Sequence, residues 1–339
     1  MNNGLSVVTG ASGHVGYALV RELEDRGANY RILIRSDSKI FDGLNCEKAY
    51  GDVTDPASLE KAFEGADVVY HLAGLIDVGN GRQEALRKVN VEGTKNVVAA
   101  CKKCGVSRLV FVSSVDAMKP LSCNSLITEP FKYDPDSVES AYGKTKAEAS
   151  QFVLDSAEEN FKTTIILPSA CIGPYDFKIS TAGQMVRMIM RGLMPVSLNF
   201  GGYNFVDVRD VAKGIVAAAE RGKSGESYLI TGEVISADQI INLVARLSGR
   251  KAPLIKMPYS LTMVLAPLAE LYYKISGANP VFTRTSVRIL THNCNFSNKK
   301  AKEELGYSPM SVEESFKDMI DWISKTEGIA IKKTKKAGK

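Results

Sequence analysis

The stretch Thr9-Gly10-Ala11-Ser12-Gly13-His14-Val15-Gly16 decides the fold of this chain. A short apolar run at residues 5–8 leads into it, and apolar residues at helical spacing follow it from 15 to 23. Strand, glycine-rich turn and helix in this order are the context in which such a turn binds a dinucleotide. The glycines permit a tight turn, close approach of a pyrophosphate and close packing of the helix on the strand. The helix N-terminus offers free N–H groups to phosphates. We therefore predict dinucleotide contacts from Gly10, Ser12, Gly13, His14, Val15 and Gly16.

The composition is that of an ordinary globular protein. The 339 residues are 45% hydrophobic and 24% charged, and the formal net charge is +5 at pH 7. Much of the excess positive charge lies in the tail 332–339, which we interpret as a solvated, flexible end. No nucleic-acid partner is therefore predicted. Because no secretory signal precedes the first apolar run, we expect a reducing, cytoplasmic location.

The cysteines do not form the pattern of a metal site. Cys101 and Cys104 make one CxxC motif, with no second CxxC and no histidine pair nearby. A structural zinc ion needs four ligands, so we predict no metal site.

Apolar runs typical of strands alternate with helical patterns through the first two-thirds of the chain. The expected strands are 4–9, 30–35, 46–50, 67–73, 108–113 and 163–168, and the expected helices are 14–26, 56–64, 82–104 and 140–160. This alternation predicts an α/β fold, a Rossmann-type doubly wound parallel sheet with helices on both faces. The strict alternation stops after residue 168.

The end of the alternation suggests two domains. We expect residues 1–173 and about 205–231 to form the dinucleotide-binding domain. Residues of about 174–204 and 232–327 would form a smaller substrate lobe, and 328–339 a basic flexible tail.

The residues after the second expected strand bear on the choice of cofactor. An acidic residue there would bind the ribose 2′-hydroxyl, but Arg35 stands near that position and Lys39 follows. An arginine suits a 2′-phosphate, so the sequence favours NADP (NADPH), with NAD as the alternative. Asp52 follows the third strand and has two interpretations. It accepts a hydrogen bond from the adenine amino group, or it only stabilises the turn in which it lies.

Small residues follow His71 at the end of the fourth expected strand. Leu72, Ala73 and Gly74 would let a ligand lie across the carboxyl edge of the sheet. A packed structural role is favoured for His71 over catalysis. Asn90 lies inside an expected helix, where we expect it to bend the helix or to hold a water molecule.

A serine pair, a tyrosine and a lysine have the chemistry of a proton-transfer site. Ser113 and Ser114 stand at the end of the fifth expected strand, and Tyr142 and Lys146 are four residues apart on one face of the next helix. An ammonium near a phenol lowers its pKa, and such a tyrosine can protonate a carbonyl oxygen or remove a proton in reverse. A serine hydroxyl of the pair would hold the same oxygen, and Lys146 would also bind the nicotinamide ribose.

Together these motifs resemble the extended short-chain dehydrogenases/reductases of the NAD-dependent epimerase/dehydratase superfamily. The resemblance covers residues 4–326 and is closest to dihydroflavonol 4-reductase-like and 3β-hydroxysteroid dehydrogenase-like proteins. It implies that Ser114, Tyr142 and Lys146 are catalytic. It also implies an adenine contact from Asp52-Val53, and a loop under the nicotinamide that includes Pro168. Sugar-nucleotide epimerases usually carry an arginine where this chain has Tyr203, which weakens that alternative.

The substrate side of the sequence is less informative. Candidate substrate residues suggest an apolar pocket, although each could instead pack between the lobes; they are Ile76, Asp77, Asp116, Met118, Tyr175 and Phe177. The apolar stretch 258–273 is too short for a membrane span. We expect it to pack in the lobe or cap the pocket, and weak contact with a membrane surface is the alternative.

The leading hypothesis is an NADP-dependent oxidoreductase that interconverts a ketone or aldehyde and an alcohol on an apolar small molecule. The first alternative is an NAD-dependent sugar-nucleotide epimerase or dehydratase, and the second is a non-catalytic NAD(P)-binding module. The sequence does not identify the substrate or the direction of the reaction. It leaves open whether the chain forms a homodimer.

Overall fold

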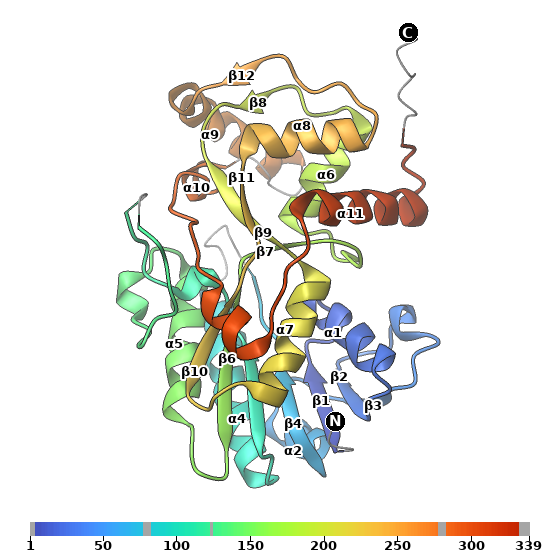
Figure 1. The fold of residues 1–339 in the computed structure, drawn as a ribbon, viewed down its shortest axis with the longest axis vertical. Coiled ribbons are helices and arrows are strands. Elements are labelled where there is room, and N and C mark those ends of the chain that lie inside the picture. Colours follow the sequence, from blue (N-terminus) through green and yellow to red (C-terminus); the bar gives the residue numbers. More distant parts are fainter. Residues whose placement is uncertain (1–3, 77–82, 123–124, 277–282, 332–339) are drawn as a thin grey trace.

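A seven-stranded sheet forms the centre of the computed structural model, which describes residues 4–76, 83–122, 125–276 and 283–331 (Figure 1). Its order is β10-β6-β5-β4-β1-β2-β3, and every pairing within it is parallel. The strands are β1 Leu5–Thr9, β2 Tyr30–Ile34, β3 Glu47–Tyr50, β4 Ala66–His71, β5 Arg108–Val112, β6 Lys162–Pro168 and β10 Glu226–Ile230. The predicted doubly wound parallel sheet is confirmed, and β10 adds a seventh strand to the six expected ones.

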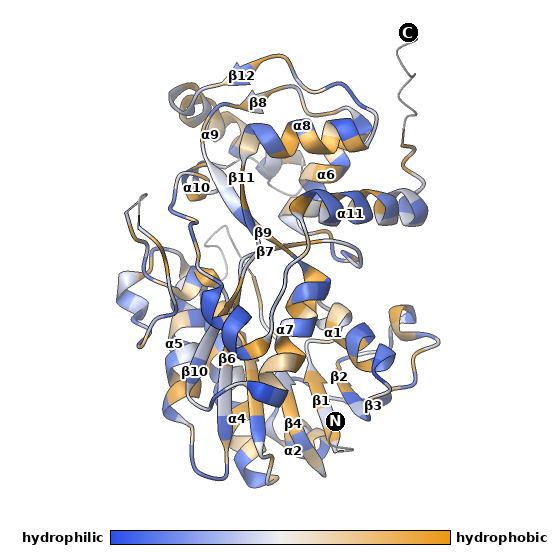
Figure 2. Ribbon diagram, in the orientation of Figure 1, coloured by the Kyte–Doolittle hydropathy of each residue, from blue (hydrophilic) through white to orange (hydrophobic). Residues whose placement is uncertain are grey.

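Helices bury both faces of this sheet, as its continuous apolar strands require. Helices α2 (Pro56–Phe63), α4 (Gly93–Lys103) and α5 (Ala141–Asp155) pack on one face. Helices α1 (His14–Asp25) and α7 (Val208–Arg221) pack on the other. The hydrophobic residues concentrate along strands such as β1 and β4 (Figure 2). Because alternate side chains of a strand point to opposite faces, each strand contributes to both cores.

The expected helix 82–104 is distorted around Asn90. Helix α3 (Gln83–Leu86) runs into a π-helical stretch, Arg87–Glu92, before α4 begins. The Asn90 side chain accepts a hydrogen bond from the Leu75 nitrogen at 2.7 Å and donates one to the Leu75 oxygen at 2.9 Å. The Asn90 side chain therefore holds the segment after β4 in place. This role explains why a polar residue occupies the distorted part of the helix.

A second group of elements lies above the central sheet in Figure 1 and has a hydrophobic core of its own. A three-stranded sheet in the order β11-β9-β7 and a two-stranded sheet, β12-β8, belong to it. Its elements are β7 Ala170–Ile172, α6 Thr181–Arg191, β8 Ser197–Leu198, β9 Gly202–Asp207, β11 Glu233–Ser236, α8 Ala237–Leu247, β12 Lys256–Met257, α9 Tyr259–Ser276, α10 Arg284–Ile289 and α11 Val312–Glu327. Short 3-10 helices span Lys39–Phe41, Val115–Ala117 and Pro135–Ser137, and a π-helical turn spans Ala301–Leu305. The division into two domains at the expected residues stays a prediction.

Helix α9 covers the stretch that the sequence marks as unusually apolar. Several of its large apolar side chains are exposed, among them Val264, Leu268 and Ile275. Within the described ranges, no helix has the length and hydropathy needed to cross a membrane. Contact of this face with a membrane surface stays a prediction.

Candidate active site

The glycine-rich turn has the geometry that a phosphate group requires. Gly10 has a φ of +74°, and a Cβ on it would lie 2.5 Å from the Ala73 nitrogen. A Cβ on Gly16 would collide with the Gly10 carbonyl oxygen. Gly13 precedes α1, and no side chain caps its N-terminal N–H groups. The turn therefore leaves a surface at the start of α1 that fits the pyrophosphate of a dinucleotide.

The strand-end residues lie beside this turn. The Leu72 nitrogen donates to the Thr9 carbonyl oxygen at 3.2 Å, and the Ala73 nitrogen donates to the Thr9 hydroxyl at 3.3 Å. Gly74 follows, and a Cβ there would lie 3.3 Å from the Asn90 side-chain oxygen. These contacts bring the ends of β1 and β4 together at the carboxyl edge of the sheet, where Pro168 also ends β6.

His71 is a packed residue, as favoured from the sequence. Its ring is fully buried between the hydroxyls of Thr9 at 2.8 Å and Thr94 at 3.0 Å. Burial lowers its pKa to about 3, with a smaller contribution from the Lys146 charge. The imidazole is therefore neutral at physiological pH and stabilises the sheet edge.

His14 and Val15 begin α1, and their side chains contact neighbouring parts of the protein. The His14 Nε2 donates to the Pro174 oxygen at 2.8 Å, and burial lowers the pKa of the imidazole. Val15 packs against the core on the α1 face of the sheet. Their backbone groups, at the first turn of the helix, remain the candidates for cofactor contact.

Two basic residues, Arg35 and Lys39, follow β2. Arg35 is 78% exposed and its Nη1 lies 3.8 Å from Asp52 Oδ2. Lys39 is exposed at the start of a 3-10 helix. The Asp52 Oδ1 accepts two hydrogen bonds from Thr54, so the turn role of Asp52 is present in the structure. The Val53 side chain is buried in the core.

Ser114, Tyr142 and Lys146 lie close together where β5 and α5 meet. Ser114 Oγ donates to Asp116 Oδ2 at 3.1 Å and lies close enough to Tyr142 to act on its pKa, and the Lys146 Nζ donates to the Val112 oxygen at 2.7 Å. The ammonium also lies 4.2 Å from the centroid of the Phe111 ring. The neighbouring serine of the pair, Ser113, faces away and bonds to Ser150 at 2.7 Å.

The electrostatics of this group differ from the expectation in one respect. Burial raises the pKa of Tyr142, the negative charge of Asp116 raises it further, and the Ser114 hydrogen bond opposes the shift. Lys146 is not among the groups that shift the pKa of Tyr142, and its Nζ donates to the Val112 carbonyl. The pKa of Tyr142 is thus raised in this structure and not lowered as expected. Burial lowers the pKa of Lys146 itself to about 7.

Asp116 links the proton-transfer group to the pocket. Its carboxylate accepts hydrogen bonds from Ser114 Oγ at 3.1 Å and from the Tyr203 hydroxyl at 3.3 Å. The Asp116 side chain is accessible from the pocket. The surrounding protein removes part of its hydration, and this desolvation raises the pKa of the carboxyl. A Cβ on Gly143 would collide with the Asp116 carbonyl oxygen, so this glycine permits the close approach of the two segments.

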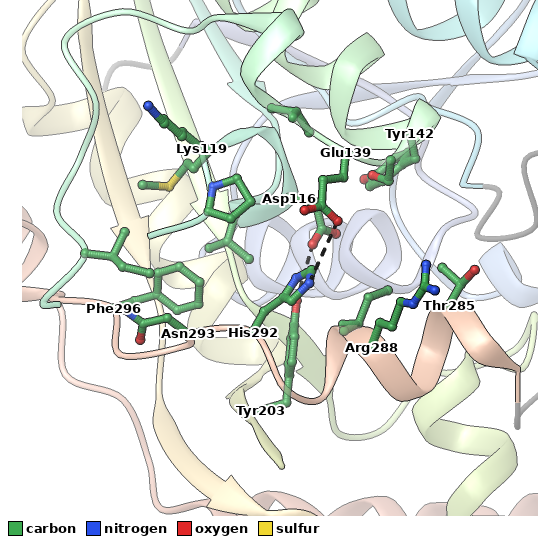
Figure 3. Close-up of a pocket in the computed structure, with 17 residues that line it drawn as sticks. Asp116, Lys119, Glu139, Tyr142, Tyr203, Thr285, Arg288, His292, Asn293 and Phe296 are labelled. Atoms are coloured by element: carbon green, nitrogen blue, oxygen red, sulfur yellow. Dashed lines mark hydrogen bonds and ion pairs between the residues drawn. The ribbon is translucent and has the colours of Figure 1, made fainter. Parts of the chain in front are cut away.

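A cavity of about 360 Å³ opens beside Tyr142 and Asp116 (Figure 3). Its apolar lining is Val115, Met118, Pro120, Ile127, Val138, Ile289 and Phe296, and its polar lining is Asp116, Lys119, Glu139, Ser140, Tyr142, Tyr203, Thr285, Arg288, His292 and Asn293. Helix α10, and not α9, supplies part of this wall. The volume is in the usual range of small-molecule sites.

The lining of the pocket includes the cationic side chain of Arg288. Its guanidinium projects from α10 on the side of the pocket where Tyr142 lies (Figure 3). Within the described part of the chain, no carboxylate forms an ion pair with it, whereas His292 lies 3.9 Å from Glu139. No sequence pattern indicated Arg288, because its position depends on how α10 packs over the sheet edge.

Three of the expected substrate residues lie outside the cavity. The rings of Tyr175 and Phe177 pack on Tyr17, with centroid distances of 5.2 and 5.1 Å, and Phe177 also packs on Trp322 at 5.3 Å. Tyr175 and Phe177 therefore have the packing role that the sequence analysis gave as the alternative to substrate binding. Ile76 is 67% exposed and does not line the cavity. Asp77 lies outside the described residues.

Comparison with known proteins agrees with this geometry. The chain is 33% identical over 323 residues to sterol demethylase protein B of Methylococcus capsulatus, covering 94% of this chain and 97% of that protein. It is 30% identical over 321 residues to a putative dihydroflavonol 4-reductase of Synechocystis, covering 93% of each. The crystal structure of gox2253 matches with a TM-score of 0.83 and 35% identity, covering 96% of this chain and 99% of that one.

The family model of the NAD dependent epimerase/dehydratase family matches residues 6–231, which include the glycine-rich turn and all three candidate catalytic residues. Reductases and dehydrogenases are among the homologues, and the chain is an NAD(P)-dependent oxidoreductase. The resemblance drawn from the sequence is thus confirmed. The chain belongs to the NAD dependent epimerase/dehydratase family.

Proposed function

We propose that this protein is an NADP-dependent oxidoreductase that interconverts a ketone or aldehyde and an alcohol on an apolar small molecule. The observation that carries the proposal is that Tyr142 lines the cavity beside Asp116, which accepts a hydrogen bond from Ser114 at 3.1 Å. The glycine-rich turn fits the cofactor, whose nicotinamide supplies or accepts the hydride when bound. The basic residues Arg35 and Lys39 support NADP over NAD.

Tyr142 would provide the proton in this reaction. Its raised pKa keeps the phenol protonated at neutral pH, which is the state that carbonyl reduction requires. As hydride reaches the carbonyl carbon, the phenol proton moves to the carbonyl oxygen and an alcohol forms. The Ser114 hydroxyl, which donates to Asp116 in this structure, would turn its proton to that oxygen, and the Asp116 N–H, which donates to Ser114 Oγ at 3.1 Å, would orient it.

Lys146 would act through its charge and its hydrogen bonds. It is buried beneath Tyr142 on the same face of α5, and its ammonium already donates to Val112. In the direction of alcohol oxidation, a nearby ammonium would stabilise the phenolate that must accept the proton. It would also donate to the hydroxyls of the nicotinamide ribose.

The pocket supports a substrate with an apolar body and an anionic group. Arg288 lines the cavity together with apolar residues such as Met118 and Ile289, and its exposed guanidinium forms no ion pair among the described residues, so a carboxylate would be a suitable partner. Several relatives have names that refer to a carboxylate or to its loss. Two of them are the 3beta-hydroxysteroid-dehydrogenase/decarboxylase isoform 1 of Arabidopsis thaliana and the sterol-4-alpha-carboxylate 3-dehydrogenase of Schizosaccharomyces pombe. They are 32% and 27% identical, respectively, to this chain. We infer that the substrate carries a carboxylate close to the carbon that is oxidised or reduced.

Replacing Arg288 by methionine should raise KM for a 3-oxo carboxylate by about tenfold to a hundredfold, because a hydrogen-bonded ion pair is lost. KM for the methyl ester of the same compound should change by less than about twofold, since the ester has no charge to pair. Steady-state kinetics with the acid and its ester measure the difference.

Arg284→Met is the matched control for this variant. Arg284 lies on the same helix, pairs with Glu270 at 3.0 Å and does not line the cavity. It should leave both KM values unchanged. If Arg288→Met weakens the acid and the ester equally, Arg288 does not bind a carboxylate.

The sugar-nucleotide alternative remains a competing proposal, because a diphosphate also needs a cation and Arg288 could supply one. Tyr203 supports the first proposal over this one, since it places an uncharged hydroxyl on Asp116 where those enzymes usually carry arginine. Incubation of the protein with NADPH and a panel of ketones, and separately with UDP-sugars, distinguishes them. Oxidation of NADPH by a ketone supports the first proposal, and redox-neutral conversion of a UDP-sugar supports the second.

A further inference from the structure

The loop between β7 and α6 brings a lysine onto the glycine-rich turn. The Lys178 Nζ donates a hydrogen bond to the Ser12 hydroxyl at 3.1 Å, although the two residues are 166 positions apart in the chain. Ser12 lies between Gly10 and Gly13, in the turn assigned to the dinucleotide phosphates. Lys178 is thus the cation that the second group of elements contributes to this turn.

The loop that carries Lys178 is fixed by packing and charge. Phe177, the preceding residue, lies between Tyr17 of α1 and Trp322 of α11. Asp176 accepts from the Ser180 nitrogen at 2.8 Å and forms a buried ion pair with Arg187 at 3.3 Å. Two of the loop residues, Tyr175 and Ile179, have positive φ values of 74° and 50°. These anchors hold the lysine at the turn.

Lys178 and Arg35 place two positive charges near this turn, and of the two only Arg35 forms an ion pair among the described residues, with Asp52. Within the described ranges, no carboxylate forms an ion pair with Lys178. Burial and the nearby charge of Arg35 both lower its pKa. The nearest acid to Arg35 is Asp52, at 3.8 Å, and its other oxygen is occupied by Thr54. Two like charges near each other, one of them hydrogen-bonded to the Ser12 hydroxyl, form a site for an anion with several oxygens.

We propose that Lys178, together with Arg35 and Ser12, binds the 2′-phosphate of NADP and so selects this cofactor over NAD. Arg35 follows β2, where the ribose 2′ position of a dinucleotide lies in this fold. Lys178 lies close enough to Arg35 for the two charges to act on each other, and it is held on Ser12 by its hydrogen bond. The inference rests on the proposed cofactor and not on the proposed reaction or substrate.

The test is a set of binding measurements on the purified protein by calorimetry, with NADP⁺, NAD⁺, 2′,5′-ADP and 5′-ADP as ligands. Lys178→Met should raise the Kd for NADP⁺ and 2′,5′-ADP by about tenfold or more, because a charge-assisted hydrogen bond to phosphate is lost. The Kd for NAD⁺ and 5′-ADP should change by less than about twofold. Lys178→Arg should restore most of the NADP⁺ affinity.

Lys317→Met is the control, because Lys317 is an exposed lysine on α11 that forms no hydrogen bond to the turn among the described residues. It should leave all four Kd values unchanged. An equal loss of NADP⁺ and NAD⁺ affinity in Lys178→Met would place the lysine at the pyrophosphate and overturn the proposal. Unchanged NADP⁺ affinity, or tighter binding of NAD⁺ than NADP⁺ by the unmodified protein, would also overturn it. Because the readout is binding alone, absence of ketone reduction would refute only the proposed function.

Discussion

Replacing Tyr142 by phenylalanine should lower kcat/KM for ketone reduction by about 10²- to 10⁴-fold, the usual contribution of a positioned proton donor. The ring remains in place, so its packing is kept and only the hydroxyl is lost. Ser114 would still hold the carbonyl oxygen but has no comparable proton to give. The Kd for NADPH should change by less than about twofold, because the glycine-rich turn and Arg35 are untouched.

Tyr133→Phe is the control for this experiment. Tyr133 is buried like many core residues and its hydroxyl bonds to Ser227 at 2.8 Å, away from the cavity. That variant should retain nearly full kcat/KM even if it is somewhat less stable. Retention of full activity in Tyr142→Phe would show that another group supplies the proton, and the assignment of roles to Ser114 and Lys146 would fail with it.

Replacing Arg187 by methionine should lower the free energy of unfolding by about 3–5 kcal/mol, because a buried carboxylate would lose its countercharge. The Arg187 and Asp176 side chains are only 4% and 2% exposed, and their closest atoms are 3.3 Å apart. Arg187 also donates through Nε to Glu327 at 2.6 Å. The Ser180 hydrogen bonds to Asp176 remain in the variant, which favours the lower end of the range.

Arg191→Met tests whether burial causes this effect. Arg191 lies one turn further along α6, is 53% exposed, and approaches Glu327 only to 3.8 Å. An exposed pair of this kind contributes about 0–1 kcal/mol, so the control should be nearly as stable as the unmodified protein. Urea denaturation measures both variants. A loss below about 1 kcal/mol in Arg187→Met would mean that the buried pair is not needed to hold the loop of Lys178.

The central sheet was predictable because its strands are apolar on both faces and alternate with amphipathic helices. Strands β1 to β6 and helices α1, α2 and α5 form close to the expected residues. The proximity of Ser114, Tyr142 and the glycine-rich turn follows from the same topology, since parallel strands end at one edge. Sequence order along the sheet was therefore sufficient to bring these groups together.

The walls of the pocket were not predictable, because they depend on contacts between segments far apart in the chain. Arg288 reaches the cavity only through the placement of α10, and no periodic pattern reports that placement. Phe177 was expected at the substrate because apolar residues line both pockets and packed interfaces. Its neighbour Lys178 was missed for the same reason, since a lone lysine in a loop carries no local signal. The pKa of Tyr142 depends on burial and on Asp116, which sequence spacing does not show.

Transfer of deuterium from NADPH to a ketone tests the central claim most directly. The protein would be incubated with NADPH deuterated at C4 of the nicotinamide, on each face in turn, and with 3-oxo carboxylates and other apolar ketones. The account predicts an alcohol that carries one deuterium at the carbinol carbon from one of the two labelled cofactors, and transfer that is slower by about 10²- to 10⁴-fold with Tyr142→Phe. A protein that transfers no deuterium to any ketone, but converts a UDP-sugar without net change in the cofactor, would contradict it.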